Sequence, residues 1–284
     1  MNLEDVFMNI ELMYQGFEQG LILALVSFGM MIPFRYLDFP DLSVEGAFPL
    51  GGAIYAVAVL SGFSSINSII LAMMSAAILT LCVSMVTCYL KVNSLLAGII
   101  LSTMAYSVNL RLMGQPSLAL FELDNLLVIN LIYLFIAVLL IKLIFYLFMY
   151  TDEGLKIRLV GYNKVVAHSS GVNITFYTCV GLLVSGLLFG LSGSLMVSFQ
   201  GFMDIGMGFG MVIHGLTSLM LGEIIIKKRS FISSLIAPLV GALMYQQILG
   251  FTVSMGLLPS DLKFFTGLLI LGVIFFNKEH TYAY

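Results

Sequence analysis

The chain has 284 residues, of which 60% are hydrophobic and only 10% are charged, and its formal net charge is −3. Soluble domains carry about 25% charged residues, so this composition excludes a soluble protein and indicates an all-α, polytopic bundle of transmembrane helices surrounded by membrane lipid. The small net charge and the lack of a basic stripe also exclude a nucleic-acid partner.

A membrane-spanning helix needs about 20 apolar residues, and this length divides the chain into consecutive segments. The second and the last segments are short, so we expect about 8–10 spans, with nine as the working value. The predicted segments lie near residues 14–34, 47–62, 66–90, 95–113, 126–149, 176–199, 207–225, 231–256 and 262–276.

The first irregular stretch is residues 33–52, which contain three prolines and three acids. A continuous helix cannot pass these prolines without losing backbone hydrogen bonds, so the sequence predicts a broken helix here. Irregular backbone at membrane depth is tolerated where it lines a watery cavity, which favours a half-helix at a transport pathway, with Asp41 and Ser43 capping its first amides. A plain inner loop with hydrated acids is the alternative.

The longest polar stretch is residues 151–175. Its core, from Tyr162 to Ser170, is long enough for two or three helical turns, and we expect Gly161 and Gly171 to mark the entry to and the exit from a short helix. Such a helix between two membrane-buried halves suits docking onto a soluble partner, and an ordinary solvated loop is the alternative.

Two further features follow in the second half. Small residues recur every fourth position within 181–194, which predicts close helix packing within the chain rather than a dimer seam. At 200–223, Asp204 precedes a glycine-rich entry into a helix that carries His214. Paired interrupted helices point to a central pathway, although a lone histidine is more often a hydrogen-bonded core residue.

Lysine and arginine placement predicts the orientation, because cytoplasmic loops are enriched in these residues. With residues 151–175 in the cytoplasm, only Arg111 and Lys263 lie near the outer face. The others lie at or near the inner face: Arg35, Lys91, Lys142, Lys156, Arg158, Lys164, Lys227, Lys228, Arg229 and Lys278.

With these residues in view, the chain resembles a family of permeases. The stretch 35–53, RYLDFPDLSVEGAFPLGGA, resembles ATP-binding-cassette importer permeases of the branched-chain amino acid and ribose type. Residues 94–116, 200–223 and 257–270 are also similar to this family. Glu45 interrupts the pattern of the sugar permeases, which argues against a sugar substrate. The resemblance implies a substrate pathway at Asp41, Ser43 and Gly46 and an ATPase-coupling segment at Gly161, Asn163, Ala167 and Gly171. From their positions in the two irregular stretches, Glu45, Gly51, Gly52, Asp204 and His214 are also expected along the pathway, and Lys164 and His168 in the coupling segment, although His168 departs from the family pattern.

The function that the resemblance implies is the permease subunit of an importer that moves a small solute, such as an amino acid, across the bacterial plasma membrane. No GxxxxGK[ST] phosphate loop occurs in the sequence, so we expect a chain that is not an enzyme and holds no cofactor or metal. The expected partners are an ATPase subunit that uses ATP, an extracellular solute-binding lipoprotein and a second permease copy. We expect a single permease domain over 1–284, with halves 1–150 and 176–284 around the coupling segment 151–175. An ion-coupled secondary transporter or channel is the alternative.

Overall fold

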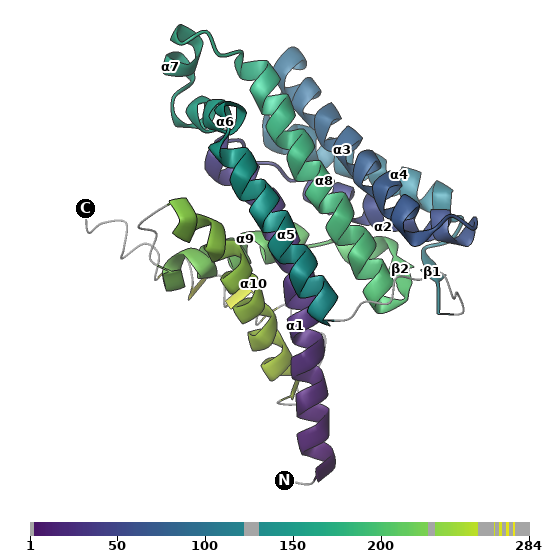
Figure 1. Ribbon diagram of the computed structural model, residues 1–284. Coiled ribbons are helices and arrows are strands. Elements are labelled where there is room, and N and C mark those ends of the chain that lie inside the picture. The colour runs from purple at the N-terminus through teal and green to yellow at the C-terminus, as the bar shows by residue number, and fades with distance from the viewer. Residues whose placement is uncertain are drawn as a thin grey trace. The chain divides into compact units, whose positions relative to one another are not determined.

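The computed structural model describes residues 3–121, 131–226 and 231–254, and the single positions 264, 267, 268, 271, 272 and 275. For residues 3–12 and 231–233 it describes the backbone alone. The described chain is almost entirely helical, as predicted (Figure 1). Its helices are α1 (Leu3–Met31), η1 (Ile32–Tyr36), α2 (Val44–Leu60), α3 (Ser65–Leu90), α4 (Ser94–Met113), α5 (Leu131–Tyr150), α6 (Asp152–Tyr162), α7 (Lys164–Ser169), α8 (Ile174–Gln200), η2 (Ile205–Gly208), α9 (Met211–Ile226) and α10 (Phe231–Ser254).

Seven helical stretches of the described chain are long and apolar enough to cross a membrane, and α2 is a shorter apolar helix. Together they match the first eight predicted segments within a few residues. The ninth predicted segment, 262–276, lies mostly outside the described residues, as does the stretch 257–270. Lys227, Lys228, Arg229, Lys263 and Lys278 of the orientation argument also lie outside them.

The chain forms two compact units, and each unit draws on both halves of the sequence. Unit 1 comprises Met1–Ser27, Leu131–Val138 and Ile213–Tyr284, and unit 2 comprises Phe28–Asn130 and Leu139–Val212. In unit 1, the backbones of α9 and α10 are in contact at Gly222. A Cβ on this glycine would overlap the carbonyl of Ala237. Small residues at helix contacts permit this close approach in membrane proteins.

Unit 2 is built around α8, which packs against α2 and α3 (Figure 1). The predicted small-residue face is the reason for this packing. Gly186 and Gly190, which belong to the predicted four-residue series, lie against the backbone of α3 at Ala77 and Ala72. Gly193, outside that series, lies against the carbonyl of Phe48 in α2. The prediction that this face makes contacts within the chain is therefore confirmed.

A short antiparallel ladder is the departure from a purely helical fold among the described residues. Strand β1 (Ser117–Ala119) follows α4 and pairs with β2 (Phe202–Asp204), which follows α8. Ser117 lies opposite Asp204 in this pairing. The ladder joins the ends of α4 and α8 and fixes the place where η2 begins.

Candidate functional site

The predicted break in the first helical region is confirmed, and it is confined to residues 37–43 between η1 and α2. Helix α1 first widens into the π-helical turn η1, in which Leu37 donates its backbone N–H to the carbonyl of Ile32 at 3.0 Å. Asp38 then adopts a positive φ of 47°, and Pro40 has no N–H with which to continue a helix. Pro49 lies inside α2, so the helix resumes before the third proline.

Asp41 organises the start of α2. Its side chain is 2% exposed, and its Oδ1 accepts the backbone N–H of Ser43 at 2.8 Å. The Ser43 hydroxyl donates to Asp41 Oδ2 at 2.6 Å. The prediction that Ser43 itself caps a helix amide is therefore wrong, because its hydroxyl is used by the neighbouring carboxylate. Asp41 holds the turn through both of its oxygens.

The three acids of the broken region have different environments, so neither the pathway interpretation nor the hydrated-loop interpretation applies to all of them. Asp38 is exposed, as a hydrated loop residue would be. Asp41 is buried, and Glu45 is half-buried in the first turn of α2. The hydrated-loop alternative thus describes Asp38 and not Asp41.

Asp204 builds a similar turn in the second half of the chain. Its Oδ1 accepts the backbone N–H of Gly206 at 2.7 Å, the same two-residue spacing that joins Asp41 to Ser43. The turn leads into η2, and the N–H of Ile205 donates to the carbonyl of Pro116 at 3.0 Å. The ladder and this bond anchor η2 beside the end of α4.

Helix η2 lies directly on α2. Gly208 has no space for a side chain, because a Cβ there would overlap the carbonyl oxygen of Glu45 and approach the ring of Pro49. The Glu45 carboxylate accepts the backbone N–H of Gly210 at 3.1 Å. Residues 165 positions apart in the sequence therefore meet at the start of α2.

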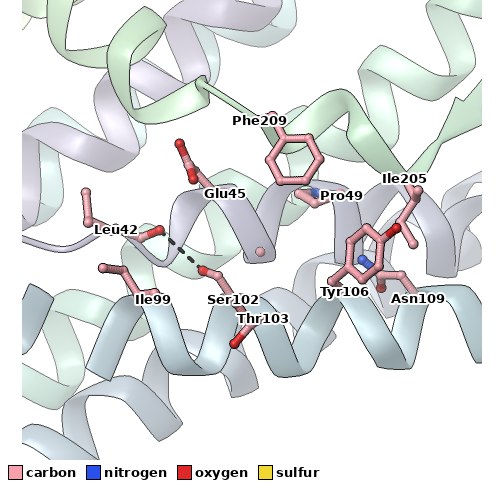
Figure 2. Close-up of a pocket in the computed structure, with 11 residues that line it drawn as sticks. Leu42, Glu45, Pro49, Ile99, Ser102, Thr103, Tyr106, Asn109, Ile205 and Phe209 are labelled. Carbon is pink, nitrogen blue, oxygen red and sulfur yellow. Dashed lines mark hydrogen bonds between the residues drawn. The ribbon is translucent and has the colours of Figure 1, made fainter. Parts of the chain in front are cut away.

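A cavity of about 310 Å³ opens where α2, α4 and η2 meet (Figure 2). The Ser102 hydroxyl donates to the carbonyl of Leu42 at 3.3 Å across it, and the rings of Tyr106 and Phe209 lie 6.4 Å apart. The cavity is lined by Leu42, Glu45, Gly46, Pro49, Ile99, Ser102, Thr103, Tyr106, Asn109, Ile205 and Phe209.

Sequence reasoning named only Glu45 and Gly46 among these lining residues. It missed the wall formed by α4, although Asn109 carries a usable signal. A polar amide inside an apolar span is costly and therefore points to function. Asn109 is 0% exposed, and neither atom of its amide has a hydrogen-bond partner among the described residues.

Six of the eight predicted pathway residues do not line the cavity. Asp41, Ser43 and Asp204 form the turns described above, and Gly51, Gly52 and His214 lie elsewhere. Gly51 and Gly52 are on α2 but serve helix packing, since Gly51 lies against Gly190 of α8 and Gly52 faces Met203. His214 belongs to unit 1, where its Nδ1 lies 2.5 Å from the Tyr245 hydroxyl. This pairing matches the reading of His214 as a hydrogen-bonded core histidine.

The predicted coupling segment is helical, so the alternative of an ordinary loop is wrong. Asn163 separates α6 from α7 and caps α7, because its Oδ1 accepts the backbone N–H groups of Val165 at 2.9 Å and Val166 at 3.2 Å. Gly171 leaves α7 with φ of 76°, as predicted for an exit glycine. The prediction that Gly161 begins the helix is wrong.

Gly161 instead allows α6 to lie on the backbone of the broken region. It is inside α6, and a Cβ there would overlap the carbonyl oxygen of Tyr36. Arg158 also donates to the carbonyl of Met149 at 3.0 Å, which ties α6 to the end of α5. The coupling segment therefore bears directly on the residues that precede Asp41.

The outer surface of the segment is apolar as well as charged. Tyr162 is 89% exposed and Val165 is 77% exposed, and Lys164 and His168 are exposed beside them. Ala167 is fully buried beneath them. On α6, the Lys156 ammonium donates to Glu153 at 2.9 Å, which lowers the pKa of the Glu153 carboxyl below its ordinary value.

This fold and site define a multi-pass helical membrane protein with interrupted helices beside a cavity, an arrangement typical of transporters. A family model described as "Branched-chain amino acid transport system / permease component" matches residues 12–274. The chain belongs to this family and is a multi-pass permease component of the bacterial plasma membrane.

Two relatives cover nearly the whole chain. The chain is 35% identical to a "Tyrosine transport system permease protein" of Clostridioides difficile (strain R20291), over 90% of this chain and 88% of that protein. It is 31% identical to an uncharacterized protein of Rickettsia prowazekii (strain Madrid E), over 94% of this chain and 96% of that protein. No solved structure matches the chain.

Proposed function

We propose that this chain is the permease subunit of an ATP-binding-cassette importer that moves an amino acid into the cell. Separate ATPase subunits would dock on α6 and α7, and an extracellular binding protein would deliver the substrate. The observation that carries this proposal is the exposed apolar surface of Tyr162, at the end of α6, and Val165, in α7, both outside the spans. Val166 is exposed beside them, and a contiguous exposed apolar patch marks an interaction surface.

The placement of basic residues supports a cytoplasmic position for this surface. Helices α3 and α8 run antiparallel, since Ser84 near the end of α3 lies 3.2 Å from Cys179 near the start of α8. Lys91, which follows α3, is therefore at the same end of unit 2 as Lys164. Arg111 lies at the far end of α4. A basic cytoplasmic end agrees with the positive-inside rule.

The choice of an amino acid as substrate rests on the family and on the tyrosine system of the relative. The mechanism follows from the contact between α6 and the broken region. Closure of the ATPases on ATP would displace α6 and α7, and α6 lies on the carbonyl of Tyr36, shortly before the Asp41 turn. We propose that two permease copies pair around the pathway, as the resemblance implies.

The test is to purify the complex through a tagged permease and to measure the ATPase subunit that copurifies. Val165→Glu places a charge on the docking surface, and we expect it to abolish copurification and ATP-dependent uptake. Asn67→Glu places the same charge at the exposed start of α3, outside the docking surface, and is the control that should leave both intact. Normal ATPase binding by the Val165→Glu complex would contradict the docking proposal.

An ion-coupled secondary transporter is the competing function. The buried pair of His214 and Tyr245 is the observation in its favour, because ionisable groups inside spans often serve proton transfer. Uptake into vesicles that hold a proton or sodium gradient, but no ATP, separates the two functions. Uptake under those conditions would replace the proposal with this alternative.

A further inference from the structure

We propose that the cavity between α2, α4 and η2 is a binding site for an aromatic amino acid whose ring carries a hydroxyl group, as in L-tyrosine. This inference rests on the function proposed above and names the substrate class at that site. The site includes Ser102, Thr103, Tyr106, Asn109 and Phe209, which the sequence resemblance does not assign.

The walls of the cavity favour an aromatic side chain. Leu42, Pro49, Ile99 and Ile205 provide apolar surface, and Tyr106 and Phe209 present two rings tilted by 33° at one side. A third ring can join such a pair through offset or edge-to-face contacts. The volume of about 310 Å³ is at the lower end of small-molecule sites, which span about 300–1,000 Å³, and it suits a single amino acid.

The polar groups stand at two levels along α4. Gly46 packs on Ser102, so Glu45 and the Ser102 hydroxyl mark one level. Asn109 is seven residues further on, a rise of about 10 Å along the helix. A molecule that reaches both levels must be elongated and must carry polar groups at its two ends, with an apolar middle.

Glu45 matches the ammonium end of such a molecule. Its Oε1 accepts the N–H of Gly210 at 3.1 Å, and a carboxylate can accept further hydrogen bonds through its other lone pairs. A hydrogen bond between an ammonium group and this carboxylate is charge-assisted and stronger than a neutral one.

Asn109 matches the hydroxyl end. A buried amide that has no partner costs free energy, and a phenol hydroxyl can both donate to its oxygen and accept from its nitrogen. Asn109 is fully covered, while Tyr106 lies one turn earlier on the same face of α4 and is partly exposed. We expect rotation of the Tyr106 side chain to give a ligand in the cavity access to the amide.

The test uses the fact that the chain contains no tryptophan. Phe209→Trp places the single indole at the cavity, and Phe176→Trp places one at the exposed start of α8, away from it. The purified full-length permease is titrated with L-tyrosine, and indole emission is excited where tyrosine does not absorb. We expect a saturable change in the Phe209→Trp protein and none in the Phe176→Trp protein.

Further variants in the Phe209→Trp background locate the ligand. Thr103→Phe fills the cavity and should weaken L-tyrosine binding at least about tenfold, whereas Met104→Phe, on an exposed position outside the lining, should not. Glu45→Gln keeps an acceptor for Gly210 but removes the charge, and should weaken binding about tenfold. Asn109→Leu should remove the preference for L-tyrosine over L-phenylalanine.

The outcomes separate this inference from the proposed function. No saturable change at Phe209→Trp, an equal change at Phe176→Trp, or unchanged binding by Thr103→Phe would overturn the binding site, even if ATP-dependent tyrosine uptake is normal. An unchanged preference in Asn109→Leu would overturn the assignment of the hydroxyl to Asn109. Binding at the cavity together with ion-driven, ATP-independent uptake would confirm the site and overturn the proposed mode of transport.

Discussion

At the scale of single residues, two aspartates, Asp41, which is buried, and Asp204, which is half-buried, set the geometry of the candidate site. Asp41 and Asp204 each bond the backbone two residues ahead and thereby set where α2 and η2 begin. Each turn gives a backbone N–H a hydrogen-bond acceptor. A buried N–H without an acceptor would lower the stability by about 1–3 kcal/mol. These acids therefore have a structural role that a pathway role does not exclude.

Replacement of Asp41 tests this role directly. Asp41→Ala leaves the N–H and the hydroxyl of Ser43 without their acceptor, and we expect a loss of about 1–3 kcal/mol in stability together with reduced uptake. Asp41→Asn keeps Oδ1 as an acceptor and should lose less. Thermal unfolding in detergent measures the order, with exposed Asp38→Ala as the control. Equal unfolding temperatures for all three variants would refute the structural role.

Gly161 and Gly171 are glycines for different physical reasons, so we expect their alanine variants to differ in stability and in coupling. Gly161→Ala must displace the backbone at Tyr36, so we expect a large loss of stability and of coupling. The new methyl group in Gly171→Ala would contact nothing, so only the left-handed backbone is unfavourable. We expect this to lower the stability by about 1–2 kcal/mol. Unfolding temperature and the ratio of ATP hydrolysed to solute moved check this order, and a milder effect at Gly161 would contradict it.

At the scale of helices, apolar length alone predicts most of the spans, and prolines at 33 and 40 predict the break. A short helix within 151–175 is also predictable, but the residue at which it begins is not. Gly161 is a glycine because of its close contact with Tyr36, which is far away in the sequence. The same limit applies to the cavity. Its walls join Glu45 to Gly210, a pairing across 165 positions that no local pattern reports. Long-range packing explains why sequence reasoning missed Phe209, whereas Asn109 does carry a sequence signal, because it is an amide inside an apolar span.

The contact of α8 with α3 gives a prediction at this scale. Gly190→Leu would drive a side chain into the backbone of Ala72 and Met73, and it should prevent the two helices from packing. Ile78→Leu, on the exposed side of α3, changes no helix contact and should fold normally. Yield of folded protein in mild detergent compares the two, and a well-folded Gly190→Leu protein would argue against this packing.

At the scale of the whole molecule, the family membership and the proposed role define one decisive experiment. The chain reconstituted alone in liposomes, without ATPase subunits or nucleotide, should move no L-tyrosine, because no phosphate-loop motif occurs in its sequence. Addition of the copurified ATPase and binding protein with ATP should restore uptake. Steady flux through the lone chain would disprove dependence on an ATPase.

The β1–β2 ladder has a consequence for how motion would spread through unit 2. Helix α8 has 27 residues, so it is a stiff helix of about 40 Å with the α6–α7 segment at one end and strand β2 at the other. Strand β2 continues directly into η2, which lines one side of the cavity. A tilt of α8 would therefore also move η2. If the ATPase docks on α6 and α7 as proposed, tilting of α8 would move η2 over the cavity although the ATPase contacts neither η2 nor the substrate.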